Sequence, residues 1–410
     1  MCSMDTYQRA DPLVGTVLDR RYRVDAPIAS GGMSTVYRGL DVRLDRPVAL
    51  KVMDSRYSGD QQFLTRFERE AKAVARLKDP ALVAVYDQGG GGSSREAPFL
   101  VMELVEGGTL RELLSERGPM PPHAVAAVLT PVCRGLAVAH AAGLVHRDIK
   151  PENILISDAG EVKIADFGLV RAVAEAGITS TSVILGTAAY LSPEQVGTGD
   201  STPRSDVYAV GILAYELLTG AAPFTGDTAL SVAYQRMDHD VPPPSTGIAG
   251  VPRQFDELVL RATDRDPAAR YADAGELADA VAGVVDELRL PPFRVPAPQQ
   301  SAQHRAATEY HSRVRTEAVR PGPNARPNPT REYGADFADD LNSALEESDT
   351  EPEYSPAPTQ FAGIDLDDFA WARQRARRTT LIWMLVLLTL TGLVAAGAWT
   401  LGSNLPGLLD

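Results

Sequence analysis

A short run of polar side chains in this sequence combines residue types that could do chemistry together. Asp148, Lys150 and Asn153 lie close together, and Asp166 follows thirteen residues after Asn153. The set offers a carboxylate for an incoming hydroxyl, an ammonium for a phosphate, and an amide and a carboxylate for a magnesium ion. Phosphoryl transfer asks a protein mainly for positioning and charge neutralisation, which groups of these types can supply.

The residues around this set predict the elements that must position it. Two apolar runs, residues 154–156 and 162–164, flank a turn, which predicts a hairpin that carries Asn153 and Asp166. Apolar residues at helical spacing over residues 124–142 predict a supporting helix that ends near Gly143.

The N-terminal side of the chain predicts a small sheet with one helix over residues 61–77. Short β-prone runs predict strands at residues 22–28, 36–40, 48–53 and 99–102. A turn with paired glycines between the first two strands would let backbone N–H groups approach phosphates, although an ordinary glycine turn looks the same. Lys51 lies in an apolar run and needs a partner. Glu70 is the better candidate, Glu68 competes with it, and either could be a solvated helix charge.

Taken together, these motifs resemble those of bacterial, eukaryotic-like serine/threonine-protein kinases of the actinobacterial membrane type. The catalytic run from His146, the Asp166-Phe167-Gly168 turn and the stretch that ends at Glu194 carry the resemblance, and the layout of the whole chain agrees with it. The resemblance implies an α+β, bilobal protein kinase fold with a small β-rich N-lobe and a mainly helical C-lobe. It also implies ATP and Mg²⁺ (or Mn²⁺) as cofactors.

The resemblance also implies roles for the catalytic residues. Asp148 would orient the substrate hydroxyl and accept its proton, and Lys150 would neutralise charge on the γ-phosphate. Asn153 and Asp166 would hold the metal ion. Lys51 would bind the α- and β-phosphates and pair with Glu70.

The nucleotide is expected between the glycine turn and the connector that follows residues 99–102. The candidate residues of the turn are Ile28, Ala29, Ser30, Gly31, Gly32, Met33, Ser34 and Val36. Met102, Glu103 and Val105 are expected at the adenine, together with Lys51 and Asn153 at the phosphates and metal. Ala29 and Ser34 replace two glycines of the usual pattern, so weaker ATP binding is expected.

Several further residues would have structural roles by the same resemblance. Thr187 would contact Asp148 and Lys150, Glu194 would pair with Arg270, and Asp206 would hold the backbone of the catalytic loop. His146, Phe167 and Cys133 are interpreted as packing residues.

Thr179 and Thr181 lie in a polar, unpatterned stretch between Asp166 and Glu194. We hypothesise that both are autophosphorylated and that Arg147 binds the added phosphate. The alternative is a solvated loop rich in serine and threonine.

The expected function is a membrane-anchored, non-specific serine/threonine protein kinase in signal transduction. The alternative is a pseudokinase scaffold that binds nucleotide or partners without turnover. Pseudokinases typically lack the lysine, the base or a metal ligand. The sequence retains Lys51, Glu70, Asp148, Asn153 and Asp166, which favours an active enzyme.

Composition divides the 410 residues into segments. With the resemblance, we expect these to be an N-terminal tail (1–20), a kinase domain (21–290), a disordered juxtamembrane linker (291–378), a transmembrane helix (379–402) and a short extracytoplasmic tail (403–410). The net charge of −14 argues against direct binding of nucleic acid. The two cysteines, Cys2 and Cys133, have no metal-ligand spacing and are compatible with a reducing compartment.

Residues 379–402 contain no charge and are long enough for one crossing of a membrane. The preceding arginines are Arg373, Arg375, Arg377 and Arg378. Because arginines prefer the cytoplasmic flank, we expect a single-pass plasma-membrane protein with its kinase domain in the cytoplasm and its C-terminus outside. A buried core helix is the alternative.

The expected partners are protein substrates, the lipid bilayer, and a second kinase domain for autophosphorylation in trans. Phosphothreonine-reading proteins of the FHA type could bind the linker threonines. These are Thr308, Thr316, Thr330, Thr350 and Thr359.

Overall fold

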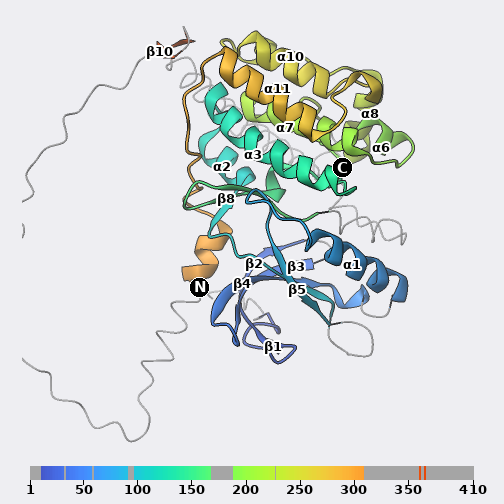
Figure 1. The fold of residues 1–410 in the computed structure, drawn as a ribbon, viewed down its shortest axis with the longest axis vertical. Coiled ribbons are helices and arrows are strands. Elements are labelled where there is room, and N and C mark those ends of the chain that lie inside the picture. The colour runs from blue at the N-terminus through green and yellow to red at the C-terminus, as the bar shows by residue number, and fades with distance from the viewer. Residues whose placement is uncertain are drawn as a thin grey trace, which may run out of the picture.

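The structure is a computed structural model of the chain. It describes residues 11–31, 34–57, 60–90, 97–167, 188–226, 228–308, 360–361 and 364–365. Two lobes are stacked in Figure 1, with a sheet and one helix in the lower lobe and helices in the upper lobe. The predicted bilobal architecture is therefore confirmed.

The N-lobe is an antiparallel sheet of six strands in the order β1-β2-β3-β4-β6-β5. The strands are β1 Val17–Leu18, β2 Tyr22–Ser30, β3 Ser34–Asp41, β4 Arg46–Met53, β5 Val85–Gly89 and β6 Phe99–Met102. A 3-10 turn at Ser55–Tyr57 precedes helix α1 (Gln61–Val74), whose first N–H groups are capped by Asp60. The predicted strands are confirmed, and the helix ends three residues earlier than predicted.

Both faces of the N-lobe sheet are covered, which explains why β4 is a nearly continuous apolar run. Ala49 and Met53 face α1 and pack with Phe63 and Phe67, whereas Val48 and Leu50 pack on the opposite face. Lys51 lies in β4 on the same face as Ala49 and Met53, so the sheet places its side chain at a buried position on the α1 side.

Three short strands form the junction between the lobes: β7 Gly107–Thr109, β8 Ile154–Ser157 and β9 Val162–Ile164. The predicted hairpin is confirmed by the antiparallel pairing of β8 and β9. Gly107 has a φ of 147°, and a Cβ there would lie 2.0 Å from the Ile156 carbonyl oxygen. Glycine is therefore required where the connector meets β8.

The C-lobe packs its helices around α7. The helices are α2 Leu110–Arg117, α3 Pro122–Ala141, α6 Pro193–Gly197, α7 Pro203–Thr219, α8 Ala229–Asp238, α9 Pro244–Gly247, α10 Arg253–Ala262 and α11 Ala274–Glu287. Two 3-10 turns, Pro151–Asn153 and Pro267–Ala269, complete it. Residues 205–218 of α7 are all buried. Cys133, on α3, has no exposed surface, which confirms its structural interpretation.

Among the described residues, α3 is the helix long and apolar enough to cross a membrane. It packs against α7 and α11 in the core of the C-lobe, so it is a core helix. The predicted membrane span, residues 379–402, lies outside the described residues, as does the N-terminal tail up to residue 10.

The predicted start of the disordered linker is wrong, because the chain remains packed beyond residue 290. Residues 302–308 are helical, and the exposed fractions of Val295, Ser301 and Ala306 are 1%, 0% and 2%. Composition suggested disorder because this stretch is rich in proline and glutamine. A few small or apolar side chains and captured backbone amides are enough to order it.

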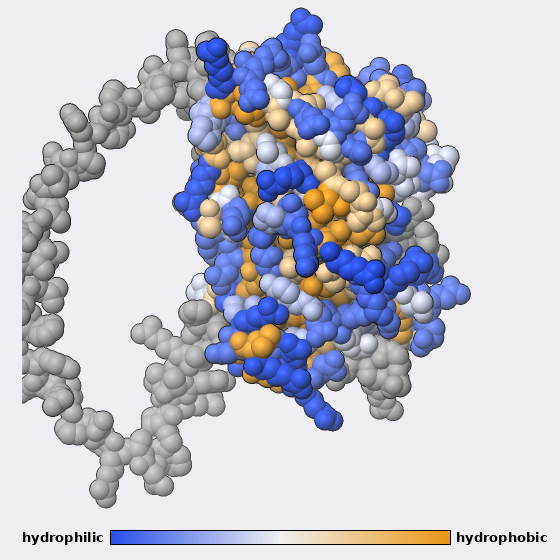
Figure 2. Space-filling view, viewed as in Figure 1, coloured by the Kyte–Doolittle hydropathy of each residue, from blue (hydrophilic) through white to orange (hydrophobic). Residues whose placement is uncertain are grey.

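Further along the predicted linker, Gln360–Phe361 (β10) and Ile364–Asp365 (β11) pair as two short antiparallel strands. The other linker residues after 308 lie outside the described part. On the face of the molecule shown in Figure 2, hydrophilic side chains predominate and apolar areas are interspersed among them.

Candidate active site

The structure brings together the three polar residues of the catalytic run. Lys150 Nζ lies 3.0 and 2.8 Å from the two carboxylate oxygens of Asp148. Asn153 Nδ2 donates to the Asp148 carbonyl oxygen (2.7 Å) and to Asp148 Oδ2 (2.9 Å). Because its amide nitrogen is used in this way, the amide oxygen of Asn153 is the atom left for a cation.

The backbone beneath Asp148 is held by Asp206 of α7. The N–H groups of His146 and Arg147 each donate to its carboxylate at 2.7 Å, and His140 Nε2 lies 2.9 Å from it. Arg147 has a left-handed φ of 71°, which is costly for a residue other than glycine. The two charge-assisted bonds to Asp206 offset this strain, so the predicted role of Asp206 is confirmed.

His146 is a packing residue, as predicted. Its ring is fully buried, and its centroid lies 4.6 Å from that of the Phe167 ring. Nδ1 accepts from the Asp148 N–H at 3.3 Å, so the ring proton is on Nε2, which donates to the Ala165 carbonyl oxygen at 2.9 Å. Both nitrogens are used for positioning.

Lys51 pairs with the predicted metal ligand Asp166. Its Nζ lies 2.8 Å from Asp166 Oδ1, and its side chain is only 6% exposed. Burial raises the pKa of the Asp166 carboxyl, but the Lys51 ammonium outweighs this effect, and the pKa lies below its usual value. Asp166 therefore stays ionised, as a metal ligand must. Its φ of 62° is a second left-handed conformation at the site.

The two candidate glutamates of α1 differ in their surroundings. Glu68 is 58% exposed at its side chain and lies 3.6 Å from Lys72, one turn away. Glu70 is half-buried, and its Oε2 atom is inaccessible to solvent. This difference favours Glu70, but its pairing with Lys51 stays a prediction.

The two predicted metal ligands are joined by the β8–β9 hairpin. The Ala165 N–H donates to the Asn153 carbonyl oxygen at 2.8 Å, next to the pairing of Ile154 with Ile164. Within the described ranges, no three His, Cys, Asp or Glu side chains form a metal cluster by themselves. Magnesium typically binds one or two protein oxygen ligands, waters and substrate phosphates, so Asn153 and Asp166 fit this ion.

The predicted nucleotide loop lies at the ends of β2 and β3. Ile28, Ala29 and Ser30 belong to β2, and Ser34 and Val36 belong to β3. The Gly31 N–H donates to the Ser34 carbonyl oxygen at 2.8 Å. Gly32 and Met33 lie outside the described residues. Ala29 pairs with Val36 in the ladder, so alanine at this position causes no backbone strain.

Apolar side chains from both lobes meet below this loop. Val36, Met102, Val105 and Leu155 belong to one apolar cluster. A flat aromatic ring such as adenine fits between surfaces of this kind. The Glu103 N–H donates to the Ala84 carbonyl oxygen at 2.8 Å, and its carboxylate lies 2.9 Å from Lys163, so these groups of Glu103 position the connector.

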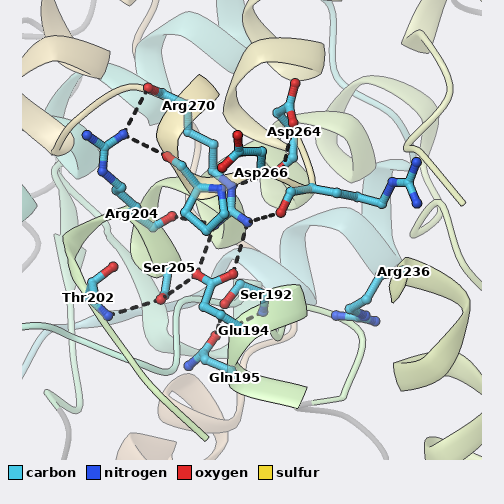
Figure 3. Close-up of polar contacts among 12 residues, drawn as sticks. Ser192, Glu194, Gln195, Thr202, Arg204, Ser205, Arg236, Asp264, Asp266 and Arg270 are labelled. Atoms are coloured by element: carbon cyan, nitrogen blue, oxygen red, sulfur yellow. Dashed lines mark hydrogen bonds and ion pairs between the residues drawn. The ribbon is translucent and has the colours of Figure 1, made fainter. Parts of the chain in front are cut away.

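The stretch from Asp166 to Glu194, called the activation segment here, has in its described part a buried ion pair at its end (Figure 3). Both carboxylate oxygens of Glu194 lie 2.9 Å from the guanidinium of Arg270, which is fully buried, and Ser205 Oγ donates to Glu194 at 2.7 Å. The predicted pairing is confirmed. Burial raises the pKa of Glu194. The contacts with Arg270 and Ser205 have a larger, opposite effect, so the pKa lies below its usual value.

A polar cluster around Arg111 of α2 was not predicted from the sequence. The guanidinium lies 2.8 Å from Glu152, 2.6 Å from Glu216 and 2.7 Å from the Tyr190 hydroxyl, and that hydroxyl donates to Glu216. It joins the catalytic loop to the end of the activation segment. No local pattern marks it, because its members are far apart in sequence. Thr179, Thr181 and Thr187 lie outside the described residues.

The fold and this site define a protein kinase. The chain belongs to this family, because residues 22–279 match the model of the protein kinase domain. It is 66% identical to the serine/threonine-protein kinase PknL of Mycobacterium tuberculosis, over 97% of this chain and 98% of that protein. PknA of the same organism is 43% identical, over 71% of this chain and 68% of that protein.

A solved structure agrees with the family assignment. The crystal structure of the PknI kinase domain of Mycobacterium tuberculosis is 27% identical, with a TM-score of 0.52. The match covers 66% of this chain and 98% of that one. The resemblance stated from the motifs is thus confirmed.

Proposed function

We propose that this protein is a serine/threonine protein kinase that transfers the γ-phosphate of ATP to hydroxyls of protein substrates. Two observations carry the proposal: Asp148 is fixed by Lys150 and Asn153, and Lys51 pairs with Asp166, which the β8–β9 hairpin joins to Asn153. The relatives PknL and PknA are both named serine/threonine-protein kinases, which supports the same function.

Each residue contributes positioning or charge. Asp148 orients the substrate hydroxyl and accepts its proton, and Lys150, already in contact with Asp148, balances the charge that develops on the phosphate. Lys51 binds the α- and β-phosphates and takes Glu70 as its partner. Asn153 and Asp166 hold Mg²⁺, which supplies charge neutralisation when bound. Val36, Met102 and Val105 enclose the adenine.

Transfer of radiolabel from ATP to myelin basic protein tests the proposal. Asp148→Asn should lower the rate by at least about 100-fold, because it removes the proton acceptor. A pseudokinase would transfer no label in either protein. All of the predicted catalytic residues are present, which favours an active enzyme over that alternative.

Autophosphorylation of Thr179 and Thr181 is the regulatory part of the proposal. Arg69, Arg147, Glu70 and Phe167 line one cavity beside α1, where a phosphate could bring the segment against this helix. Mass spectrometry of the active enzyme should find phosphorylated loop peptides that a Lys51→Met sample lacks. Unchanged loop peptides in the two samples would contradict this assignment.

Anchorage in the plasma membrane through residues 379–402 is the topological part. The uncharged span and the preceding arginines support it. The full chain should sediment with membranes, whereas a chain that ends at residue 378 should not. Phosphorylated linker threonines would then recruit FHA-type proteins, and a second kinase domain would act in trans.

A further inference from the structure

The chain after α11 lies along the outside of the connector between the lobes. Residues 291–308, called the strap here, leave the C-lobe and end in a helical turn beside the junction of the lobes (Figure 1, orange). Val295 is part of the C-lobe core, and the Phe293 ring meets the His123 ring edge-on at 5.0 Å. The strap is therefore packed into the domain at its start.

Two glutamates of α2 capture the backbone of the strap. Glu116 accepts from the N–H groups of Gln299 and Gln300 at 3.0 and 2.7 Å. Glu112, one turn earlier, accepts from the Ala302 N–H at 2.8 Å. Because these are bonds from main-chain amides to carboxylates, they fix the path of the strap on α2.

Ser301 binds the strap to Gly107, at the end of the connector between the lobes. Its hydroxyl donates to the Gly107 carbonyl oxygen and accepts from the His304 N–H at 3.0 Å, which caps the helical turn. The His304 ring lies 3.0 Å from Asp158 in the β8–β9 turn. Ser301 is fully buried, so this contact is made away from solvent.

The strap also passes close to the backbone of Gly108 in β7. A Cβ at this position would lie 2.4 Å from Pro298 Cγ and 2.6 Å from Ser301 Cβ. Its φ is outside the left-handed region, so the backbone does not require glycine there. The passage of the strap, together with Glu112 Oε2 at 2.8 Å, accounts for the missing side chain.

Helix α2 also carries Arg111, which contacts Glu152, the residue before Asn153. Its guanidinium joins Glu152 of the catalytic loop to Tyr190 and Glu216. We propose that the strap positions α2, and through Arg111 the protein-substrate side of the active site. This inference rests on the proposed kinase function. It makes residues 291–308 a positioning element that connects the linker to the catalytic loop.

Ser301→Asp in the full-length protein tests the docking. Aspartate still caps a helix, but its charge would face the Gly107 carbonyl oxygen and Glu112, so the strap should leave α2. Gly108→Ala is a second variant that acts from the opposite surface. Hydrogen exchange should show protected amides at Gln299, Gln300 and Ala302 in the wild type and faster exchange there in both variants.

Kinetics test the positioning. Both variants should raise the KM for a peptide substrate by about 3- to 10-fold, the size expected for coupled contacts, with the KM for ATP changed much less. Arg111→Met should raise the same KM without exposing the strap. If both act through α2, the effect of combining Ser301→Asp with Arg111→Met is smaller than the product of the single effects.

Gly283→Ala is the matched control, because a Cβ there meets no atom within 4 Å. It should change neither hydrogen exchange nor kinetics.

Unprotected strap amides in the wild type, or protected strap amides in both variants, would overturn the docking. A released strap with unchanged peptide KM, or fully multiplicative effects, would overturn the positioning. If the wild type transfers no phosphate, the proposed function fails instead. Faster exchange of α2 in Ser301→Asp then supports positioning by the strap, and unchanged exchange overturns it.

Discussion

Glu68 and Glu70 lie two positions apart on α1, yet only Glu70 is shielded from solvent. Glu70→Gln should therefore lower kcat/KM by at least about 10-fold, because Lys51 loses the partner that orients it on the phosphates. Glu68→Gln is the matched control and should leave activity within about twofold, since exposed pairs contribute little. Steady-state kinetics with ATP as the varied substrate measures both. Equal effects of the two variants would refute the assignment of Glu70.

Asp206 is the residue on which the left-handed backbone at Arg147 depends. Asp206→Ala should lower the free energy of unfolding by about 3 kcal/mol, because two buried N–H groups lose a charged acceptor. It should also lower kcat, since Asp148 follows directly. Urea unfolding and kinetics check this, with the exposed Asp279→Ala on α11 as control. A loss no larger than that of the control would show that the strain is held elsewhere.

At the scale of elements, the Glu194–Arg270 pair fastens the end of the activation segment to the C-lobe. Glu194→Gln should cost about 3 kcal/mol at pH 7, because Arg270 remains buried without its counter-ion.

The pKa of Glu194 is lower in the folded state than its usual value, so its contribution to stability depends on pH. The contribution is complete above the unfolded pKa of about 4.3 and is lost as the pH falls through the lower, folded value. The difference in unfolding free energy between wild type and Glu194→Gln should therefore shrink only in acid. A difference that shrinks between pH 8 and pH 6 would contradict the pairing.

The elements that the sequence predicted are those with short-range signals. The strands that flank the glycine turn, the helix with Phe63 and Phe67, and the hairpin between Asn153 and Asp166 follow from local periodicity and turn residues. Family motifs supplied Asp206 and the Glu194–Arg270 pair.

The contacts that the sequence did not predict are long-range or made by the backbone. Arg111 and Glu216 are 105 residues apart, and no periodicity connects them. The strap binds α2 through main-chain amides, which every residue except proline has, so its composition could not distinguish it from a disordered linker. The Lys51–Asp166 pair was not predicted either, because the two residues are far apart in sequence and no local pattern connects them.

At the scale of the whole molecule, the chain stays packed on the C-lobe beyond the matched kinase domain, up to residue 308. The free energy of unfolding of a chain that ends at residue 308 should be about 2 kcal/mol higher than that of a chain that ends at residue 290. The reason is that the shorter chain lacks Val295 and exposes the apolar site that Val295 covers. Urea unfolding of the two chains measures the difference. Equal stabilities would mean that the strap adds nothing to the folded domain.

The burial of Cys133 has a practical consequence. Its side chain has no exposed surface, and burial raises the pKa of the thiol to about 12. Since the thiolate is the reactive form, alkylating reagents should not modify Cys133 while α3 stays packed. Cys2 is the one other cysteine of the chain. The rate at which Cys133 becomes alkylated therefore reports how often the C-lobe opens, without any engineered probe.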